Sequence, residues 1–342
     1  MSKVFVGMSG GVDSSLTAAL LVEQGHDVTG VYMKNWTQDL PGMKCPWAED
    51  LADAKRVAVK LGIDFKVYDF EKDYRHKVVE YMIDEYKLGR TPNPDIMCNE
   101  EVKFKLFLET ALEDGADMIA TGHYARTEDG RLLQAVDANK DQTYFLYRVT
   151  EDALQKTLFP LGGFTKPEVR QMAQERNLVT ATKKESMGIC FVGQIGIREF
   201  LSQYVTTKPG DIIDKDTGKL LGRHDGALFY TLGQRHGLDI GGGLPYYVVS
   251  KDIDQNIVYV SQNINDENMW RDVVTLSNLH WINNEPNEGE TIQARIRHRA
   301  TLVEAMIQDG VLTLNDAQRA ITPGQSVVLY QDGICLGGGI VA

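Results

Sequence analysis

The stretch Ser9-Gly10-Gly11-Val12-Asp13-Ser14-Ser15 stands between the apolar run Val4 to Met8 and a helical pattern from Ser14 to Gln24. Glycines let a backbone turn sharply and approach a ligand without a side-chain clash. The start of the next helix offers unpaired N–H groups and a positive dipole end, which together favour a phosphate. No lysine follows the glycines, so the pattern is not the P-loop of kinases and GTPases. The stretch predicts a phosphate-binding loop, and a serine-capped glycine turn is the structural alternative.

The regions around this loop alternate strand-like and helical patterns. Strand-like runs are Val4 to Met8, Val28 to Met33, Phe65 to Phe70 and Ala116 to Ala125, and helical patterns are Ser14 to Gln24, Ala48 to Leu61, Tyr74 to Leu88 and Val102 to Leu112. Alternation of this kind predicts an α/β domain, a parallel sheet with helices on both faces. Such sheets bind ligands at the carboxyl ends of their strands.

After about Phe200 the pattern changes to short runs separated by Gly and Asp turns, such as Lys208-Pro209-Gly210-Asp211. The runs Thr291 to Arg299, Val311 to Leu314 and Ser326 to Tyr330 are of β type and predict a small β-barrel. We therefore divide the chain into an N-terminal domain (1–200), a small central module (201–272) and a C-terminal β-barrel (273–342).

Composition narrows the class of protein. Of the 342 residues, 43% are hydrophobic and 25% charged, which is typical of a globular chain and excludes a disordered one. No apolar run approaches the roughly 20 residues of a membrane span, and the N-terminus lacks a signal-peptide pattern, so we expect no membrane partner and a cytoplasmic location. The formal net charge of −12 argues mildly against a nucleic-acid partner, although it does not govern what one face binds.

Cysteines are the candidate reactive groups. Cys45, Cys98, Cys190 and Cys335 are too few for a disulfide scaffold and lack the close pairing of a zinc site. Asn99 is a suitable N-cap, which places Cys98 just before a predicted helix, where the dipole would lower the thiol pKa. Cys190 lies between Gly188 and Gly193 in a segment that resembles a pliable loop, with Lys183 and Lys184 upstream to favour a thiolate. For every thiol, a buried inert side chain is the alternative.

Several polar groups add candidate contacts. His123 follows Gly122 at the exit of a predicted strand, and the alternative is a partly buried histidine with one backbone hydrogen bond. Arg295-Ile296-Arg297-His298-Arg299 is the sharpest basic cluster. In a strand, period two would place its three arginines on one face, suited to phosphates, whereas a solvated barrel face is the alternative.

The motifs, taken together, resemble those of the tRNA-specific 2-thiouridylases, which belong to the PP-loop ATP pyrophosphatases. The resemblance runs from the first strand to the last residues. Its motifs are Ser9 to Ser15, Met33-Lys34-Asn35-Trp36, Asn93-Pro94-Asp95 with Cys98, Thr121 to Ala125, Lys140 to Leu146 and Glu185 to Phe191.

The resemblance implies an ATP-dependent sulfurtransferase that exchanges O2 of the wobble uridine of the Lys, Glu and Gln tRNAs for sulfur. Cys190 would carry a persulfide, loaded by a sulfur-relay donor protein, and Cys98 would be the nucleophile. Magnesium would come with ATP, placed by Asp13, and no cage of protein ligands is expected. The implied ATP contacts are Gly7, Met8, Ser9, Gly10, Gly11, Val12, Asp13, Ser14, Met33 and Gly122. The implied tRNA contacts are Asn93, Pro94, Asp95, His123, Lys140, Asp141, Gln142, Arg297, His298 (more often Tyr in the family) and Gln325.

Two rival functions remain open from the residues themselves. A PP-loop synthetase that uses ammonia would need no cysteine pair, so full activity after Cys98→Ser would favour it. A nucleotide sensor without catalysis would bind ATP, release no pyrophosphate and have no use for the arginine-bearing barrel.

Overall fold

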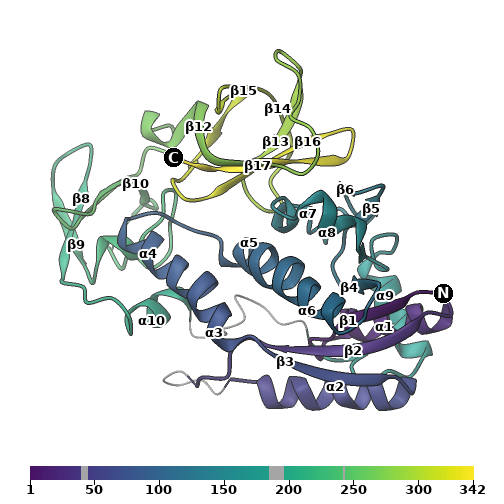
Figure 1. The fold of residues 1–342 in the computed structure, drawn as a ribbon. Coiled ribbons are helices and arrows are strands. Elements are labelled where there is room, and N and C mark those ends of the chain that lie inside the picture. The colour runs from purple at the N-terminus through teal and green to yellow at the C-terminus, as the bar shows by residue number, and fades with distance from the viewer. Residues whose placement is uncertain (40–44, 185–195, 242) are drawn as a thin grey trace.

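The computed structural model describes residues 1–39, 45–184, 196–241 and 243–342. Its N-terminal part is built on a parallel sheet in the order β3-β2-β1-β4-β7, seen in the lower half of Figure 1. The strands are β1 (Lys3–Gly7), β2 (Asp27–Lys34), β3 (Asp64–Asp69), β4 (Met118–Ala120) and β7 (Thr157–Leu158). Because the chain leaves β1 toward β2 on one side and later adds β4 on the other, the sheet has a switch point between β1 and β4.

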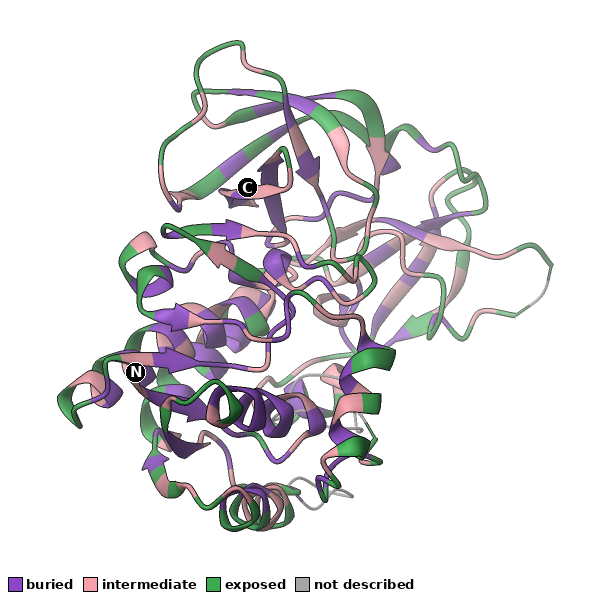
Figure 2. Ribbon diagram, turned by 90° about the vertical axis from the view of Figure 1, so that its right-hand side faces the viewer, coloured by how far each residue is buried: buried purple, intermediate pink, exposed green. Residues whose placement is uncertain are grey.

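Helices cover both faces of this sheet, which explains why β1, β2 and β4 are largely buried, whereas the edge strand β3 is partly exposed (Figure 2). Val4 and Val6 of β1 pack against α1 (Val12–Glu23) and α2 (Trp47–Leu61). Phe5, which points the other way, joins a core with residues of the run from α5 to α6. The two-residue period of a strand therefore divides β1 between two cores, as the α/β prediction requires.

The predicted helices exist, but their bounds differ. The pattern predicted over Tyr74 to Leu88 is a run of α3 (Glu71–Tyr74), π-type turns η1 (Arg75–Glu80) and α4 (Tyr81–Lys87). The helix predicted over Val102 to Leu112 begins eight residues earlier, as α5 (Pro94–Met97), π-type η2 (Cys98–Leu106) and α6 (Phe107–Glu113). The strand predicted over Ala116 to Ala125 is only β4. The remaining helices of this part are α7 (Thr143–Leu146), α8 (Glu151–Gln155), α9 (Lys166–Glu175) and α10 (Ile197–Leu201). Within the described ranges, no helix has the length and apolar character needed to cross a membrane.

The central module is a separate small sheet in the order β10-β11-β8-β9, in which β11 and β8 are parallel. Its apolar interior includes Ile212, Val248, Val258 and Val260. Its strands are β8 (Gly210–Asp214), β9 (Leu220–His224), β10 (Tyr247–Asp252) and β11 (Ile257–Ser261), with single 3-10 turns η3 (Ala227–Phe229) beside it and η4 (Glu267–Met269) after it.

The C-terminal part is a closed antiparallel barrel in the order β12-β15-β14-β13-β16-β17, in which β17 pairs back to β12. The strands are β12 (Trp270–Trp281), β13 (Ile292–Arg295), β14 (Val303–Gln308), β15 (Val311–Arg319), β16 (Ser326–Gln331) and β17 (Ile334–Val341). A hairpin from the N-terminal part, β5 (Arg126–Glu128) and β6 (Arg131–Leu133), pairs with the start of β17. The barrel prediction is confirmed, but its sheet includes residues from the first domain.

Buried polar contacts fasten the barrel to the N-terminal part. The Tyr144 hydroxyl donates to the Ser326 carbonyl at 2.8 Å, and the Tyr147 hydroxyl lies 3.1 Å from Ser326 Oγ. Both tyrosines are almost fully buried. Burying a hydroxyl without a partner is costly, so these pairs restrict the angle at which the barrel docks.

Candidate active site

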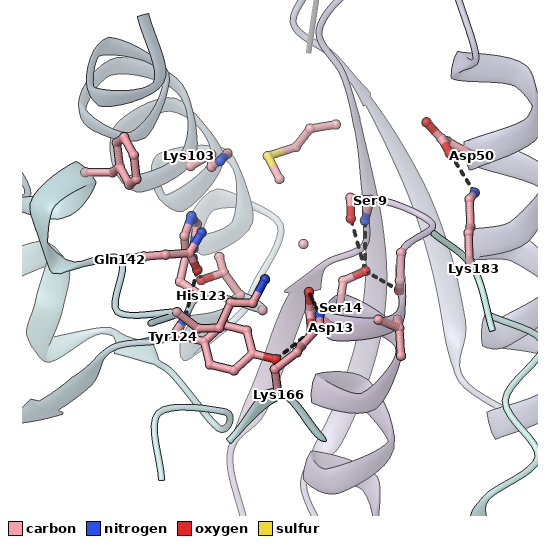
Figure 3. Close-up of a pocket in the computed structure, with 18 of the residues that line it drawn as sticks. Ser9, Asp13, Ser14, Asp50, Lys103, His123, Tyr124, Gln142, Lys166 and Lys183 are labelled. Carbon is pink, nitrogen blue, oxygen red and sulfur yellow. Dashed lines mark hydrogen bonds and ion pairs between the residues drawn. The ribbon is translucent and has the colours of Figure 1, made fainter. Parts of the chain in front are cut away.

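A cavity of about 340 Å³ opens at the carboxyl ends of β1 and β4, at the switch point of the sheet. Twelve of the residues implied by the resemblance line it: Gly7, Ser9, Gly11, Val12, Asp13, Ser14, Met33, Gly122, His123, Lys140, Gln142 and His298. Met8, Gly10, Asn93, Pro94, Asp95, Cys98, Asp141, Arg297 and Gln325 do not. The cavity therefore unites the phosphate loop with residues from far along the chain, among them His123, Gln142 and Lys166 (Figure 3). His298 and Arg299 of the barrel also line it.

The phosphate loop has the conformation that its sequence predicts. Gly10 has φ +74°, and a Cβ there would lie 2.3 Å from the Asp50 carbonyl oxygen. A Cβ at Gly122 would lie 2.8 Å from the Ser14 nitrogen, so the two glycines let the loop pack between α2 and the end of β4. The Ser9 N–H donates to Ser14 Oγ at 3.2 Å, and both serines line the cavity. Backbone and hydroxyl groups are thus gathered at the start of α1, as phosphate binding requires.

Asp13 does not have the surroundings of a magnesium ligand. Its two carboxylate oxygens lie 2.7 and 2.8 Å from Lys166 Nζ, and the Tyr124 hydroxyl donates to Oδ1 at 2.9 Å (Figure 3). Magnesium takes oxygen ligands at about 2.0–2.1 Å in octahedral geometry, and with an ammonium group beside both carboxylate oxygens this conformation does not offer them to the metal. Nor do three His, Cys, Asp or Glu side chains gather as a metal would need anywhere in the described ranges. Placement of magnesium by Asp13 therefore stays a prediction that this conformation does not support, and no step is derived through the metal.

His123 stands in the cavity wall as a buried, neutral side chain. Only 9% of it is exposed, and its Nδ1 lies 2.8 Å from the Thr121 hydroxyl. Burial, with a smaller contribution from the charge of Lys103, holds the pKa of His123 well below its usual 6.5. At neutral pH the imidazole is therefore uncharged and suited to hydrogen bonding with a base rather than to pairing with a phosphate.

Cys98 is not at a helix start. Asn93, not Asn99, caps the helix by accepting from the Asp95 N–H at 3.1 Å, so Cys98 lies one turn inside the helical run. The Asn99 amide instead donates to the Phe145 carbonyl at 2.9 Å. Cys98 is 5% exposed, and burial raises the pKa of its thiol. The predicted low pKa is therefore wrong for this conformation, because desolvation outweighs any effect of the helix dipole.

Cys190 lies outside the described residues, so its predicted role is untested. The lysines predicted to activate it lie in the cavity wall. Lys183 forms ion pairs with Asp50 at 2.7 Å and with Asp53 at 2.6 Å, so its positive charge is already balanced by carboxylates. Cys45 and Cys335 are buried free thiols, as the structural alternative expects.

The polar triplet Lys140, Asp141 and Gln142 divides between two environments. Lys140 and Gln142 line the cavity. The side chain of Asp141 is 1% exposed and lies 2.9 Å from Arg295 of β13, which is itself 11% exposed. Asp141 also accepts from the Thr143 hydroxyl at 2.8 Å. Its predicted contact with tRNA is therefore replaced by a buried ion pair that holds the barrel to the N-terminal part.

The arginine cluster does not form one face of a strand. β13 ends at Arg295, and Arg299 has φ +63°, so residues 297–299 form a turn beyond the strand. Arg297 is exposed and donates to the Arg319 carbonyl, while the centroid of the His298 ring lies 4.5 Å from that of Phe145, with the two rings tilted by 44°. The expectation of three aligned arginines is wrong because the strand is shorter than the run of β-type residues.

Gln325 is brought next to the segment that precedes Asn93. The Thr91 N–H donates to the Pro323 carbonyl at 2.9 Å, and Gly324 packs against Arg90 and Thr91. Asp95 is exposed beyond this contact. Gln325 and the segment that leads into Asn93, both predicted to contact tRNA, therefore lie next to each other outside the cavity wall.

Three polar residues of the site escaped the sequence analysis. Lys166 and Asp50 line the cavity, as does Lys103, whose charge acts on both Cys98 and His123. Each lies in a helix that is otherwise ordinary in composition. For Lys166 the sequence signal is the alternation of strands and helices, because it places helix starts, such as that of α9, at one edge of the sheet.

A parallel sheet with this loop at its switch point, carrying a docked β-barrel, defines a PP-loop type nucleotide-binding fold with an added barrel. Family models match residues 2–194 (tRNA methyl transferase HUP domain), 198–262 (tRNA methyl transferase PRC-barrel domain) and 271–341 (aminomethyltransferase beta-barrel domain).

Curated relatives cover almost the whole chain. It is 48% identical over 352 residues to the tRNA-specific 2-thiouridylase MnmA of Bacillus subtilis (strain 168), covering 99% of this chain and 95% of that one. It is 49% identical to the protein of the same name from Exiguobacterium sibiricum, covering 99% and 93%. A solved 4-thiouridine synthetase–RNA complex with bound ATP matches weakly, at 19% identity and TM-score 0.38 over 60% of this chain and 50% of that one. The chain belongs to the tRNA-specific 2-thiouridylase family.

Proposed function

We propose that the protein replaces O2 of the wobble uridine of the Lys, Glu and Gln tRNAs with sulfur, at the expense of ATP. The observation that carries the proposal is the match to 2-thiouridylases over 99% of the chain. The cavity supports it, because a phosphate loop, a neutral histidine and a basic rim face one space. A small negatively charged cosubstrate and a polynucleotide base therefore have matching surroundings there.

In the proposed reaction, the uridine oxygen attacks the α-phosphate of ATP, and pyrophosphate leaves. The phosphate loop and Ser9 and Ser14 hold the phosphates, while Gln142 and His123 face the base. The terminal sulfur of a Cys190 persulfide then attacks C2, and AMP leaves with the oxygen. The Cys98 thiolate attacks the Cys190 sulfur, which releases the thiolated base and forms a Cys98–Cys190 disulfide. An external thiol reduces that disulfide by two electrons, and a sulfur-relay protein reloads Cys190.

Burial of Cys98 bears directly on this scheme. Its thiol lies in the apolar core and its pKa is raised, so in this conformation it is mostly protonated and unreactive. The charge of Lys103, in the cavity wall, acts in the opposite direction and favours the thiolate. Reaction therefore requires the helical run around Cys98 to expose the sulfur to the cavity, for which binding of tRNA supplies the free energy.

The test is nucleoside mass spectrometry of tRNA that lacks the modification, after incubation with the protein, ATP, and a cysteine desulfurase with cysteine. We expect 2-thiouridine only when ATP and the donor are both present. Cys98→Ser should load sulfur on Cys190 without turnover, and Cys190→Ser should bind tRNA but accept no sulfur. Cys335→Ala, which removes a buried thiol from the barrel, is the matched control. Full thiolation by the Cys98 or Cys190 variant would contradict the two-thiol scheme, and pyrophosphate release without thiolation would favour an ammonia-using synthetase.

A further inference from the structure

The cavity beside the phosphate loop is strongly basic although the chain carries a net charge of −12. The charged groups in its wall are Asp13 and Asp50 on the acidic side and Lys103, Lys140, Lys166, Lys183, Lys184 and Arg299 on the basic side. A concave wall with an excess of one charge sign concentrates its field and attracts a ligand of the opposite sign. Polyphosphate is the ligand class that suits such a wall beside a loop of this kind.

Lys166 is the cation that is fixed beside the loop. Its side chain is 9% exposed, and its Nζ lies 2.7 Å from Asp13 Oδ1 and 2.8 Å from Oδ2. The Nζ also lies over the Tyr124 ring, 5.6 Å from the centroid. The Tyr124 hydroxyl donates to the same Asp13 oxygen, so the three groups hold one another, as Figure 3 shows. Holding a lysine side chain in one position costs conformational entropy. A role in ligand binding is a reason for a protein to bear that cost.

The backbone that carries Lys166 is fixed as well. Lys166 opens α9, and its N–H donates to Asp137 Oδ2 at 2.9 Å. Val169 and Ala173 of α9 pack in one core with Leu16 of α1, the helix that begins at the phosphate loop. The lysine and the loop therefore form one rigid unit, although Asp13 and Lys166 are 153 residues apart.

We propose that Lys166 binds the phosphate chain of ATP and of the departing pyrophosphate, and that Asp13 positions Lys166 instead of holding magnesium. The lysine that a kinase-type P-loop carries within its own sequence is here delivered by a second helix. The proposal rests on the use of ATP under the proposed function. A merely structural ion pair between α1 and α9 is the competing explanation.

Binding of inorganic pyrophosphate, ATP and adenosine to the whole protein, measured by calorimetry without magnesium in the presence of EDTA, tests the proposal. We expect Lys166→Met to weaken pyrophosphate and ATP about tenfold or more, the usual size of one charge-assisted contact. Adenosine binding should not change, because adenosine carries no phosphate. Lys166→Arg should recover part of the loss. Lys215→Met is the matched control, since Lys215 pairs with the buried Asp266 at 2.8 Å in the central module.

Asp13→Asn and the double variant test the role assigned to Asp13. If Asp13 acts by positioning Lys166, the double variant should bind pyrophosphate no more weakly than Lys166→Met alone. Additive losses would overturn the positioning role. The lysine assignment would be overturned if Lys166→Met bound pyrophosphate with wild-type affinity. It would also be overturned if the variant lost as much affinity for adenosine as for pyrophosphate. A wild-type protein that binds both ligands but never thiolates tRNA would contradict the proposed function, and its Lys166→Met comparison would still decide the lysine assignment.

Discussion

The buried ion pair between Asp141 and Arg295 makes a sharp prediction about how the barrel is held. The two side chains are 1% and 11% exposed, lie 2.9 Å apart, and the Arg295 guanidinium stacks 5.1 Å from the Tyr330 ring. Asp141→Asn keeps the shape and removes the negative charge, which leaves a buried cation without a counter-charge. Breaking a buried pair in this way typically costs about 3–5 kcal/mol. With an m value of about 3 kcal/mol/M, the urea midpoint should fall by about 1 M or more.

Urea unfolding, followed in parallel by tryptophan fluorescence and circular dichroism, measures this loss. Glu23→Gln is the control, because the Arg176–Glu23 pair is half exposed and should contribute no more than about 1 kcal/mol. Adding Arg295→Met to Asp141→Asn should restore part of the stability, since the unpaired charge is gone. A loss in Asp141→Asn no larger than that in Glu23→Gln would refute the reasoning, as would a double variant less stable than the single one.

Further predictions concern the loop, the histidine and the thiol. Gly10→Ala should destabilise the fold by more than about 1 kcal/mol, because φ is +74° there and the added Cβ would meet the Asp50 carbonyl. In the same urea assay, the control Gly11→Ala should change the stability by no more than about 0.5 kcal/mol, because its Cβ would lie 3.5 Å from the nearest atom, Ser9 Oγ. His123 stays neutral when folded, so the stability it contributes is present above its unfolded pKa of about 6.5 and is lost as pH falls. Between pH 6.5 and 5 the wild type should lose more stability than His123→Asn, by up to about 1.7 kcal/mol as measured from urea midpoints. Equal losses would contradict the lowered pKa. Cys98 should react with iodoacetamide about tenfold or more slowly than in the urea-unfolded protein at neutral pH, and equal rates by peptide mass spectrometry would exclude a buried thiol.

The fold was predictable because its signals are local. Alternating patterns, a glycine loop after the first strand and a change of pattern after about Phe200 all lie within short windows, and each of them follows from hydrophobic periodicity or turn chemistry. The errors are local as well. Asn99 is as good a cap as Asn93, but Pro94 suits a first helical position, so the helix begins there and Cys98 falls inside it.

The candidate site was predictable only where a single segment carries it. The phosphate loop and the His123 motif were found from their own residues, and both line the cavity. Lys166 was missed because its meaning depends on Asp13, and only the packing of α9 on α1 brings the two together. Asp141 was misassigned for the same reason, since its partner is on the barrel.

These two cases show that the cavity belongs to more than one domain. His298 and Arg299 complete its wall from the barrel, and they lie three and four residues after Arg295, the residue that Asp141 holds. Lys140 and Gln142, on either side of Asp141, line the same wall from the N-terminal part. The buried ion pair therefore helps to align the two halves of the cavity rim, because Asp141 lies between two lining residues and Arg295 lies three residues before His298. A barrel that docked at another angle would leave the phosphate loop intact and separate it from the basic turn. Adenosine binding should accordingly survive Asp141→Asn better than tRNA binding does.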